Sequence, residues 1–193
     1  INIYRALGAE VPVFAHLPLI CGQDGQKLSK RHGTVSVLEY EKKGYLPEAI
    51  FNYLARLGWG HGNMEKFSRE ELARVFDLKD CSRASARIDW KKLDWLNGQY
   101  MKEADDARLA ELVQPRIEAR GGLIENGPDL VQVCGLLKTR SATLEALADA
   151  ALFFYVEKDA DPEALAAALA DGGREALALF GEKMKALDEV TPE

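Results

Sequence analysis

The stretch Pro47-Glu48-Ala49-Ile50-Phe51-Asn52-Tyr53-Leu54-Ala55-Arg56-Leu57-Gly58 indicates the fold class of this chain. Proline fits the first turn of a helix, and glycine is common just after the last turn. Between them Ile50, Tyr53, Leu54 and Leu57 recur at relative positions 0, 3, 4 and 7, so their side chains share one helix face. The segment therefore predicts an amphipathic helix that buries an apolar stripe.

Helical patterns continue toward the C-terminus. Ser68-Arg69-Glu70-Glu71 is a capping box, and 87–100 predicts a helix with Leu93 and Leu96 inward and Lys91 and Lys92 outward. After the acidic segment 103–106 we expect four or five more helices. Pro115 is expected to kink or end the first of them, and Asp161-Pro162-Glu163 to begin a later one. Only 14–21 predicts a strand, so the expected fold is mainly α.

Composition indicates a globular chain. Its 193 residues are 47% hydrophobic and 29% charged, and no stretch approaches the roughly 20 apolar residues of a membrane span. The first residues lack the basic and apolar regions of a signal peptide. The chain begins without Met inside a periodic pattern of Ile3, Leu7 and Val11, and we interpret this start as a cut through a larger protein.

Charge is distributed unevenly. Residues 1–102 carry 16 Lys and Arg against 12 Asp and Glu, a net charge of +4, whereas 103–193 carry 9 against 19, a net charge of −10. A nucleic-acid partner is therefore expected to prefer the first half. Cys21, Cys81 and Cys134 lie far apart and are odd in number, which favours buried thiols over a disulfide or metal site and indicates a reducing cytosol.

The segment Lys27-Leu28-Ser29-Lys30-Arg31-His32-Gly33 is the main candidate for chemistry. Asp24-Gly25 before it predicts a tight turn. Lys and Arg neutralise phosphate oxygens, and Ser29 can donate a hydrogen bond to them, so the segment fits a loop that follows a polyphosphate. Composition alone leaves open a solvated basic turn.

Lys27-Leu28-Ser29-Lys30-Arg31 resembles the second signature motif of class I aminoacyl-tRNA synthetases, usually Lys-Met-Ser-Lys-Ser, in the spelling of the glutamyl branch. The segments Gly44–Ala49, Asn52–Trp59 and Asp89–Tyr100 are similar to those that follow this motif in glutamyl-tRNA synthetases. A weaker similarity runs from Lys138-Thr139-Arg140 to Phe153-Phe154-Tyr155.

The resemblance implies three regions: 1–38, the end of a Rossmann-type α/β catalytic domain; 39–102, a helical stem-contact domain; and 103–193, the start of a helical anticodon-binding domain. It also implies a glutamate–tRNA ligase, which activates glutamate with ATP and transfers it to the 3′ end of tRNA in the cytoplasm. Lys30 is the expected catalytic residue, and Lys27, Ser29, Lys30 and Arg31 are expected to bind ATP, accompanied by Mg²⁺.

The same comparison limits the chain. The His-Ile-Gly-His-type first signature is absent from this sequence, and the glutamate pocket and any zinc site of the family are expected outside it. We therefore expect these residues alone to be inactive. The alternative is a helical tRNA-binding module without chemistry of its own.

Basic residues in the helical regions are candidate tRNA contacts, and for each a solvated helix face remains the alternative: Arg83, Arg87, Lys91, Lys92, Lys138 and Arg140. The tryptophans Trp59, Trp90 and Trp95 could stack on bases, but their spacing favours core packing. His16, His32 and His61 have no carboxylate or thiol at ligand spacing, so we expect no metal site in this chain.

Overall fold

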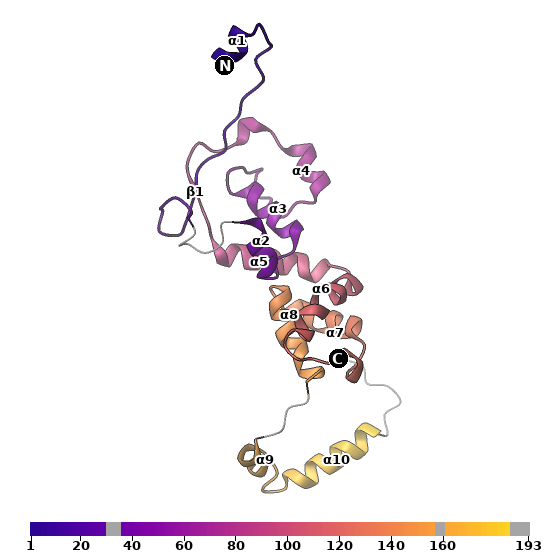
Figure 1. Ribbon diagram of the computed structural model, residues 1–193. Helices are drawn as coiled ribbons and strands as arrows, with labels where there is room; N and C mark the ends of the chain where they lie inside the picture. Colours follow the sequence, from indigo (N-terminus) through magenta and orange to yellow (C-terminus); the bar gives the residue numbers. More distant parts are fainter. Residues whose placement is uncertain (30–35, 157–160, 186–193) are drawn as a thin grey trace. The chain divides into compact units, whose positions relative to one another are not determined.

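The computed structural model describes residues 1–29, 36–156 and 161–185. These residues are mostly helical, with two short strands, which confirms the mainly α prediction (Figure 1). They divide into two compact units, Ile1–Val156 and Glu157–Glu193. The predicted regions 1–38, 39–102 and 103–193 have other boundaries and stay a prediction.

The first unit contains eight α-helices, two strands and four short 3₁₀ helices among its described residues. In chain order these are α1 (Asn2–Ala6), β1 (Ile20–Cys21), α2 (Val37–Lys42), α3 (Pro47–Arg56), α4 (Arg69–Val75), η2 (Leu78–Asp80), β2 (Ala86–Arg87), α5 (Trp90–Glu103), α6 (Asp106–Glu118), η3 (Ile124–Asn126), α7 (Leu130–Leu137), η4 (Lys138–Arg140), α8 (Leu144–Ala151) and η5 (Leu152–Phe154).

Local sequence explains where most helices begin. The Ser36 hydroxyl accepts from the Leu38 amide at the start of α2, and Pro47 occupies the first turn of α3. Ser68 and Glu71 form the predicted capping box of α4. Of the two outcomes expected at Pro115, a kink or an end of the helix, the end is excluded, because α6 continues to Glu118.

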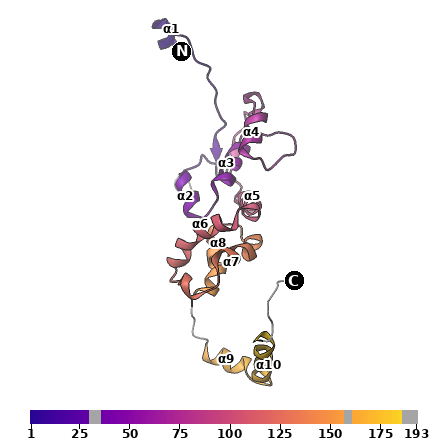
Figure 2. The same ribbon diagram turned by 90° about the vertical axis from the view of Figure 1, so that its right-hand side faces the viewer.

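Two main clusters form the core of the first unit. Tyr40, Tyr53 and Leu93 belong to a cluster that joins α2, α3 and α5. A larger cluster fills the space between α6, α7 and α8, and it also takes in Leu46 beside α3 and Met101 of α5. Figures 1 and 2 both show α5 between α3 and the α6–α8 bundle. The helices α3 and α5 both contribute to the two clusters, through Ala49 and Met101 in the larger one and through Tyr53 and Leu93 in the other.

The strands form a two-stranded parallel sheet, in which Ile20 pairs with Ala86 and Cys21 with Arg87. The prediction of a strand over 14–21 was wrong in length, since its first six residues make no ladder. The prediction of a helix from Arg87 was wrong at its start. Arg87 belongs to β2, and the helix begins at Trp90 after Asp89 caps it through the Lys92 amide.

The second unit holds α9 (Pro162–Ala168) and α10 (Gly173–Lys185). Asp161 caps α9 as predicted, because its carboxylate accepts from the amides of Glu163 and Ala164 at 2.9 and 2.8 Å. Gly172, with φ of 90°, lies in the turn before α10. None of the helices in the described residues is long and apolar enough to cross a membrane.

Candidate nucleotide loop and RNA-contact residues

The entry to the basic loop is a tight turn tied to β1. Gly25 has φ of 77°, and the Gln26 amide donates to the Asp24 carboxylate at 3.0 Å. The Gly22 amide donates to Gln26 O at 2.9 Å, and the Leu28 amide to Ile20 O at 3.0 Å. The predicted Asp-Gly turn is confirmed.

This turn leaves Lys27 exposed opposite Cys21, to which it is joined by an antiparallel bridge, and Ser29 half-buried. Lys30 and Arg31, together with His32, lie outside the described residues. The predicted ATP contacts at Lys27, Ser29, Lys30 and Arg31 stay predictions.

Arg87 lies beside the turn and not on a helix. A Cβ atom at Gly25 would lie 3.4 Å from Nη2 of Arg87. The strand β2 brings these residues together, because the Ile88 amide donates to Cys21 O at 3.0 Å. Arg87, which the sequence grouped with helical tRNA contacts, thus lies beside the turn that leads into the basic loop. Sequence patterns give no signal for this pairing, since the two strands are separated by more than 60 residues.

The exit from the loop is anchored to the helical bundle through α2. Gly44 follows this helix with φ of 78°, and its carbonyl accepts from the Leu144 amide at 2.8 Å. Arg116 of α6 donates to Glu41 O at 2.9 Å and to the Glu145 carboxylate at 2.7 Å. The α6–α8 bundle therefore fixes the C-terminal end of α2, one short helix away from the loop.

The remaining candidates in 83–92 are not equivalent. Arg83 is exposed in the segment before β2, and Lys91 is exposed in the first turn of α5. Lys92 lies on the same helix, but its ammonium is 2.8 Å from the Glu65 carboxylate. Hydrogen bonds from Lys92 and then Arg56 lower the pKa of Glu65. The four candidates Arg83, Arg87, Lys91 and Lys92 are thus divided among a loop, a strand and a helix.

The second pair of candidates lies on η4, which packs against α5. The Lys138 ammonium donates to Ala104 O at 2.8 Å and lies 2.7 Å from the Asp106 carboxylate. Arg140, two residues later, is exposed. The structure thus gives Lys138 a role within the fold and leaves Arg140 open to a partner.

Sequence reasoning misjudged one tryptophan. Trp59 is buried as predicted, and Trp90 packs on Tyr40 with ring centroids 5.9 Å apart. Trp95 is 50% exposed, so its predicted core position is wrong. The signal was present in the sequence, because Leu93 and Leu96 point inward and a residue between them must point away from them.

Among the described residues the cysteines form no disulfide and no metal site. All three cysteines are free, and burial raises the pKa of Cys134 to about 11, which keeps it protonated at neutral pH. Across 1–29, 36–156 and 161–185, no group of three His, Cys, Asp or Glu residues is placed to hold a metal ion.

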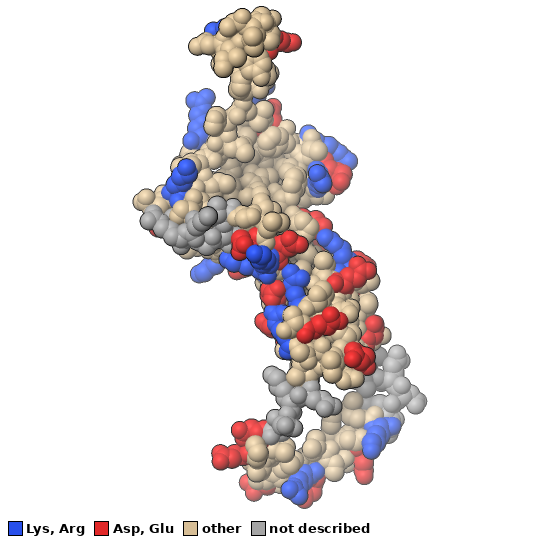
Figure 3. Space-filling view, in the orientation of Figure 1, with Lys and Arg blue, Asp and Glu red and all other residues tan. Residues whose placement is uncertain are grey.

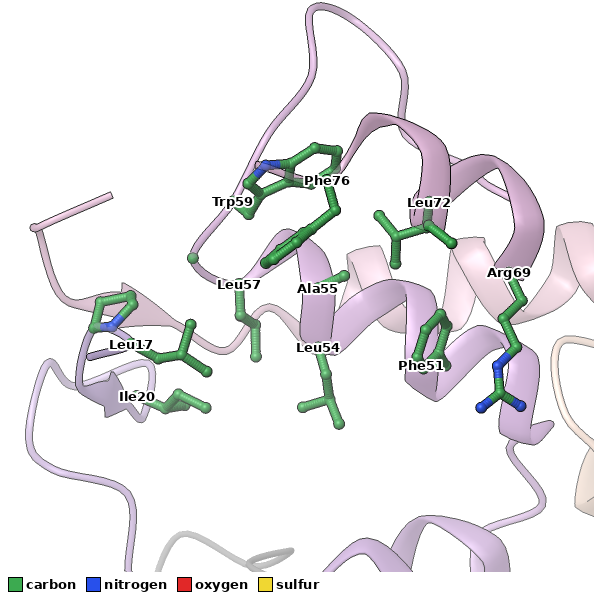
Figure 4. Close-up of a pocket in the computed structure, with 13 residues that line it drawn as sticks. Leu17, Ile20, Phe51, Leu54, Ala55, Leu57, Trp59, Arg69, Leu72 and Phe76 are labelled. Carbon is green, nitrogen blue, oxygen red and sulfur yellow. The ribbon is translucent and has the colours of Figure 1, made fainter. Parts of the chain in front are cut away.

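An apolar hollow with a volume of about 530 Å³ lies between α3, α4 and the segment before β1. Figure 4 shows Leu17 and Ile20 on one side of it and Phe51 and Arg69 on the other. Its lining is apolar except for Arg69. Figure 3 shows positive and negative side chains interspersed on the visible face of the molecule.

Comparisons with known proteins agree with this arrangement of loop, sheet and bundle. Residues 1–95 match the family described as tRNA synthetases class I (E and Q), catalytic domain, and residues 108–193 match an anticodon binding domain. A glutamate–tRNA ligase of Thiobacillus denitrificans is 52% identical over 188 residues, which are 97% of this chain and 40% of that protein. One from a Janthinobacterium species is 52% identical over 185 residues, with the same 40% of its length covered.

Solved structures give the same result at the level of the fold. The crystal structure of a glutamate tRNA ligase from Elizabethkingia meningosepticum, in complex with its amino acid, has a TM-score of 0.75 and 28% identity, and the match covers 97% of this chain and 41% of that one. Glutamate-tRNA synthetase from Elizabethkingia anophelis has a TM-score of 0.70 and 27% identity, over 98% of this chain and 41% of that one. The chain thus spans about 40% of the length of its curated relatives, and it belongs to the glutamyl-tRNA synthetases of the class I aminoacyl-tRNA synthetase family.

Proposed function

We propose that this chain is part of a glutamate–tRNA ligase and supplies its second signature loop and a tRNA-binding helical body. The observation that carries the proposal is the 52% identity over 188 residues to glutamate–tRNA ligases, across a catalytic-domain match and an anticodon-domain match in succession. The reaction class is ATP-dependent aminoacylation, carried out in the cytoplasm where the other translation components are.

In the first step a glutamate carboxylate oxygen attacks the α-phosphorus of ATP, and pyrophosphate leaves. Negative charge then builds on the departing oxygens. Lys30 is assigned to these oxygens, with Lys27 and Arg31 holding the remaining ones and Ser29 donating a hydrogen bond. Mg²⁺ is expected to arrive bound to the ATP phosphates, and no residue of this chain is assigned to it.

In the second step a hydroxyl of the terminal adenosine of tRNA attacks the glutamyl carbonyl carbon, and AMP leaves. The part played by this chain is to hold the tRNA. Arg83, Lys91 and Arg140 are the proposed backbone contacts, since phosphate contacts fix position without reading sequence. Arg87, Lys92 and Lys138 were grouped with them in sequence, but their surroundings support roles within the fold.

The loop assignment is tested by Lys30→Ala in the complete ligase, followed by glutamate-dependent exchange of pyrophosphate into ATP in the presence of tRNA. One preorganised contact contributes about 2.7–4 kcal/mol in a transition state, so we expect exchange to slow by roughly 100-fold or more with little change in tRNA affinity. Lys79→Ala, a lysine exposed on η2, is the matched control. Equal exchange by the Lys30 variant and the control removes the phosphate role.

The alternative is a tRNA-binding helical module without chemistry. It is distinguished by the same assay, because a complete protein that binds tRNA(Glu) and shows no exchange supports the module and not the ligase. Residues 1–193 alone are expected to form no adenylate under either proposal. Exchange by these residues alone contradicts our view that the first signature and the glutamate pocket are required.

A further inference from the structure

One face of α5 carries an exposed aromatic ring between two lysines. Lys91, Trp95, Gly98 and Lys102 follow one another at intervals of four, three and four residues, which places them on one face of a helix. Trp95 is 50% exposed, whereas Leu93 and Leu96 on the opposite face are buried. The helix therefore presents a polar and aromatic stripe away from its core.

The groups of this stripe have no partners within the part of the chain that the structure describes. Neither Lys91 nor Lys102 has a carboxylate within ion-pair distance there, whereas Lys92 on the same helix lies 2.8 Å from Glu65. No aromatic ring or cation of the described residues lies against Trp95, whereas Trp90 has both Tyr40 and Lys43. The two ammonium groups and the indole ring of the stripe are thus available to a binding partner.

The carboxylates next to the stripe in sequence are engaged by other groups. Asp94 accepts a hydrogen bond of 2.5 Å from the Tyr45 hydroxyl, and Glu103 forms an ion pair with Lys66. The half of the chain that contains Lys91, Trp95 and Lys102 has a net charge of +4. Lys91 and Lys102 are exposed cations that a polyanion can contact.

The exposed indole of Trp95 suits a flat group. A Cβ atom at Gly98 would lie 3.8 Å from the Cα of Ala142, so Gly98 contacts the segment before α8, whereas Trp95 and Lys102 on either side of it are exposed. A planar base can lie on the indole face while its phosphates reach the lysines on either side. Such combinations of an aromatic platform and flanking cations bind unpaired nucleotides.

We propose that the Lys91–Trp95–Gly98–Lys102 face of α5 is an RNA-binding site at which Trp95 stacks on an unpaired base of the tRNA and Lys91 and Lys102 contact its phosphates. The inference rests on the proposed function, which supplies tRNA as the RNA, and adds a base-stacking residue to it. Stacking on a tRNA base in the protein–tRNA complex would explain why a tryptophan is exposed in this position.

The test measures binding of a tRNA(Glu) transcript to the complete ligase at several salt concentrations. Trp95→Ala and Trp95→Leu are expected to weaken binding about tenfold with an unchanged salt slope, because stacking releases no counterions. Trp95→Phe, which keeps a ring, is expected to retain most of the affinity. Lys102→Ala is expected to lower the log–log salt slope by about 0.7–0.9, and Lys79→Ala to leave it unchanged.

A fluorescence measurement gives an independent readout. Quenching of tryptophan emission by tRNA is expected to fall in Trp95→Phe, with Trp59 and Trp90 as internal references. A blunt RNA duplex with no unpaired bases is expected to bind the wild-type protein and Trp95→Ala equally.

Three outcomes overturn the stacking site: equal tRNA affinity for wild type, Trp95→Ala and Trp95→Leu; equal loss of affinity with Phe and with Leu; or a lower melting temperature of Trp95→Ala with unaltered RNA binding, which indicates that the ring packs on another protein surface. Failure of the proposed function is distinguishable, because the wild-type protein itself then shows no glutamate-dependent exchange.

Discussion

The carbonyl of Gly44 accepts a hydrogen bond of 2.8 Å from the amide of Leu144, which joins the end of α2 to the start of α8. The two residues are 100 positions apart in the sequence. The contact requires glycine, because a Cβ atom at position 44 would lie 2.6 Å from the Glu145 amide nitrogen. This hydrogen bond thereby joins the segment that follows the basic loop to the helical bundle.

Gly44→Ala is expected to destabilise the protein by more than the ordinary cost of a left-handed alanine, because the added methyl meets backbone atoms that cannot rotate away. We expect a loss of about 2–4 kcal/mol in the free energy of unfolding, measured with urea. Gly62→Ala is the matched control, since Gly62 also has a positive φ, of 53°, but nothing lies within 4 Å of its Cβ position. Equal losses for the two variants contradict the proposed close approach.

Asn97→Leu is expected to cost about 2–5 kcal/mol in unfolding free energy, because it leaves the buried Leu46 amide without a partner and removes the hydrogen bond to the Ala142 carbonyl. Asn97 is fully buried, accepts from the Leu46 amide at 2.8 Å and donates to Ala142 O at 2.5 Å. Asn63→Leu, at an exposed position, serves as control. A loss no larger than the control's shows that these hydrogen bonds do not hold the start of α3 and the segment before α8 to α5.

Glu145→Gln is expected to lower stability at neutral pH and to have less effect in acid. Burial alone raises the pKa of Glu145, but hydrogen bonds from Arg120 and Arg116 outweigh it and hold the pKa below its usual 4.5. A carboxyl whose pKa is lower in the folded state stabilises the fold above the unfolded pKa. This contribution is lost as the pH falls through the folded pKa.

The measurement is urea unfolding at pH 7, 5, 4 and 3, with Glu125→Gln on η3 as an exposed control. The difference between wild type and Glu145→Gln is expected to be constant from pH 7 to about 5 and to shrink below about 4.5. A difference that does not vary with pH assigns the effect to packing and not to the two arginines.

Lys138→Ala and Arg140→Ala are expected to act on different properties, although both residues lie on η4. Lys138 is held between Asp106 and the Ala104 carbonyl, so its loss is expected to reduce stability by roughly 1–3 kcal/mol. Arg140 is exposed, so its loss is expected to weaken tRNA binding and reduce the salt slope, with unchanged stability. Melting temperatures and tRNA titrations of both variants check this, and a reversed pattern contradicts the assignment.

Helix starts and stops could be read directly from the sequence. Pro47, Ser68 and Asp161 begin helices as expected, because capping and proline geometry depend only on residues within one turn. At Pro115 the local rule allowed a kink or an end of the helix, and α6 continues to Glu118. The buried side chains of Val113 and Ile117 hold the helix in place across the missing hydrogen bond.

The sequence by itself determined the helical class, the turn at Asp24-Gly25 and the family, because these depend on near neighbours and on the order of motifs along the chain. Only the tertiary structure decided which charged and aromatic side chains have partners within the fold and which are exposed. Arg87 pairs with Cys21 in the two-stranded sheet and so lies beside the turn before the basic loop and not on a helix. Lys138 forms an ion pair with Asp106. Trp95 was left facing outward because the buried face of α5 is occupied by Leu93 and Leu96. A charged or aromatic side chain can bind a partner only when no residue distant in sequence already contacts it. Those contacts depend on how the helices and strands pack.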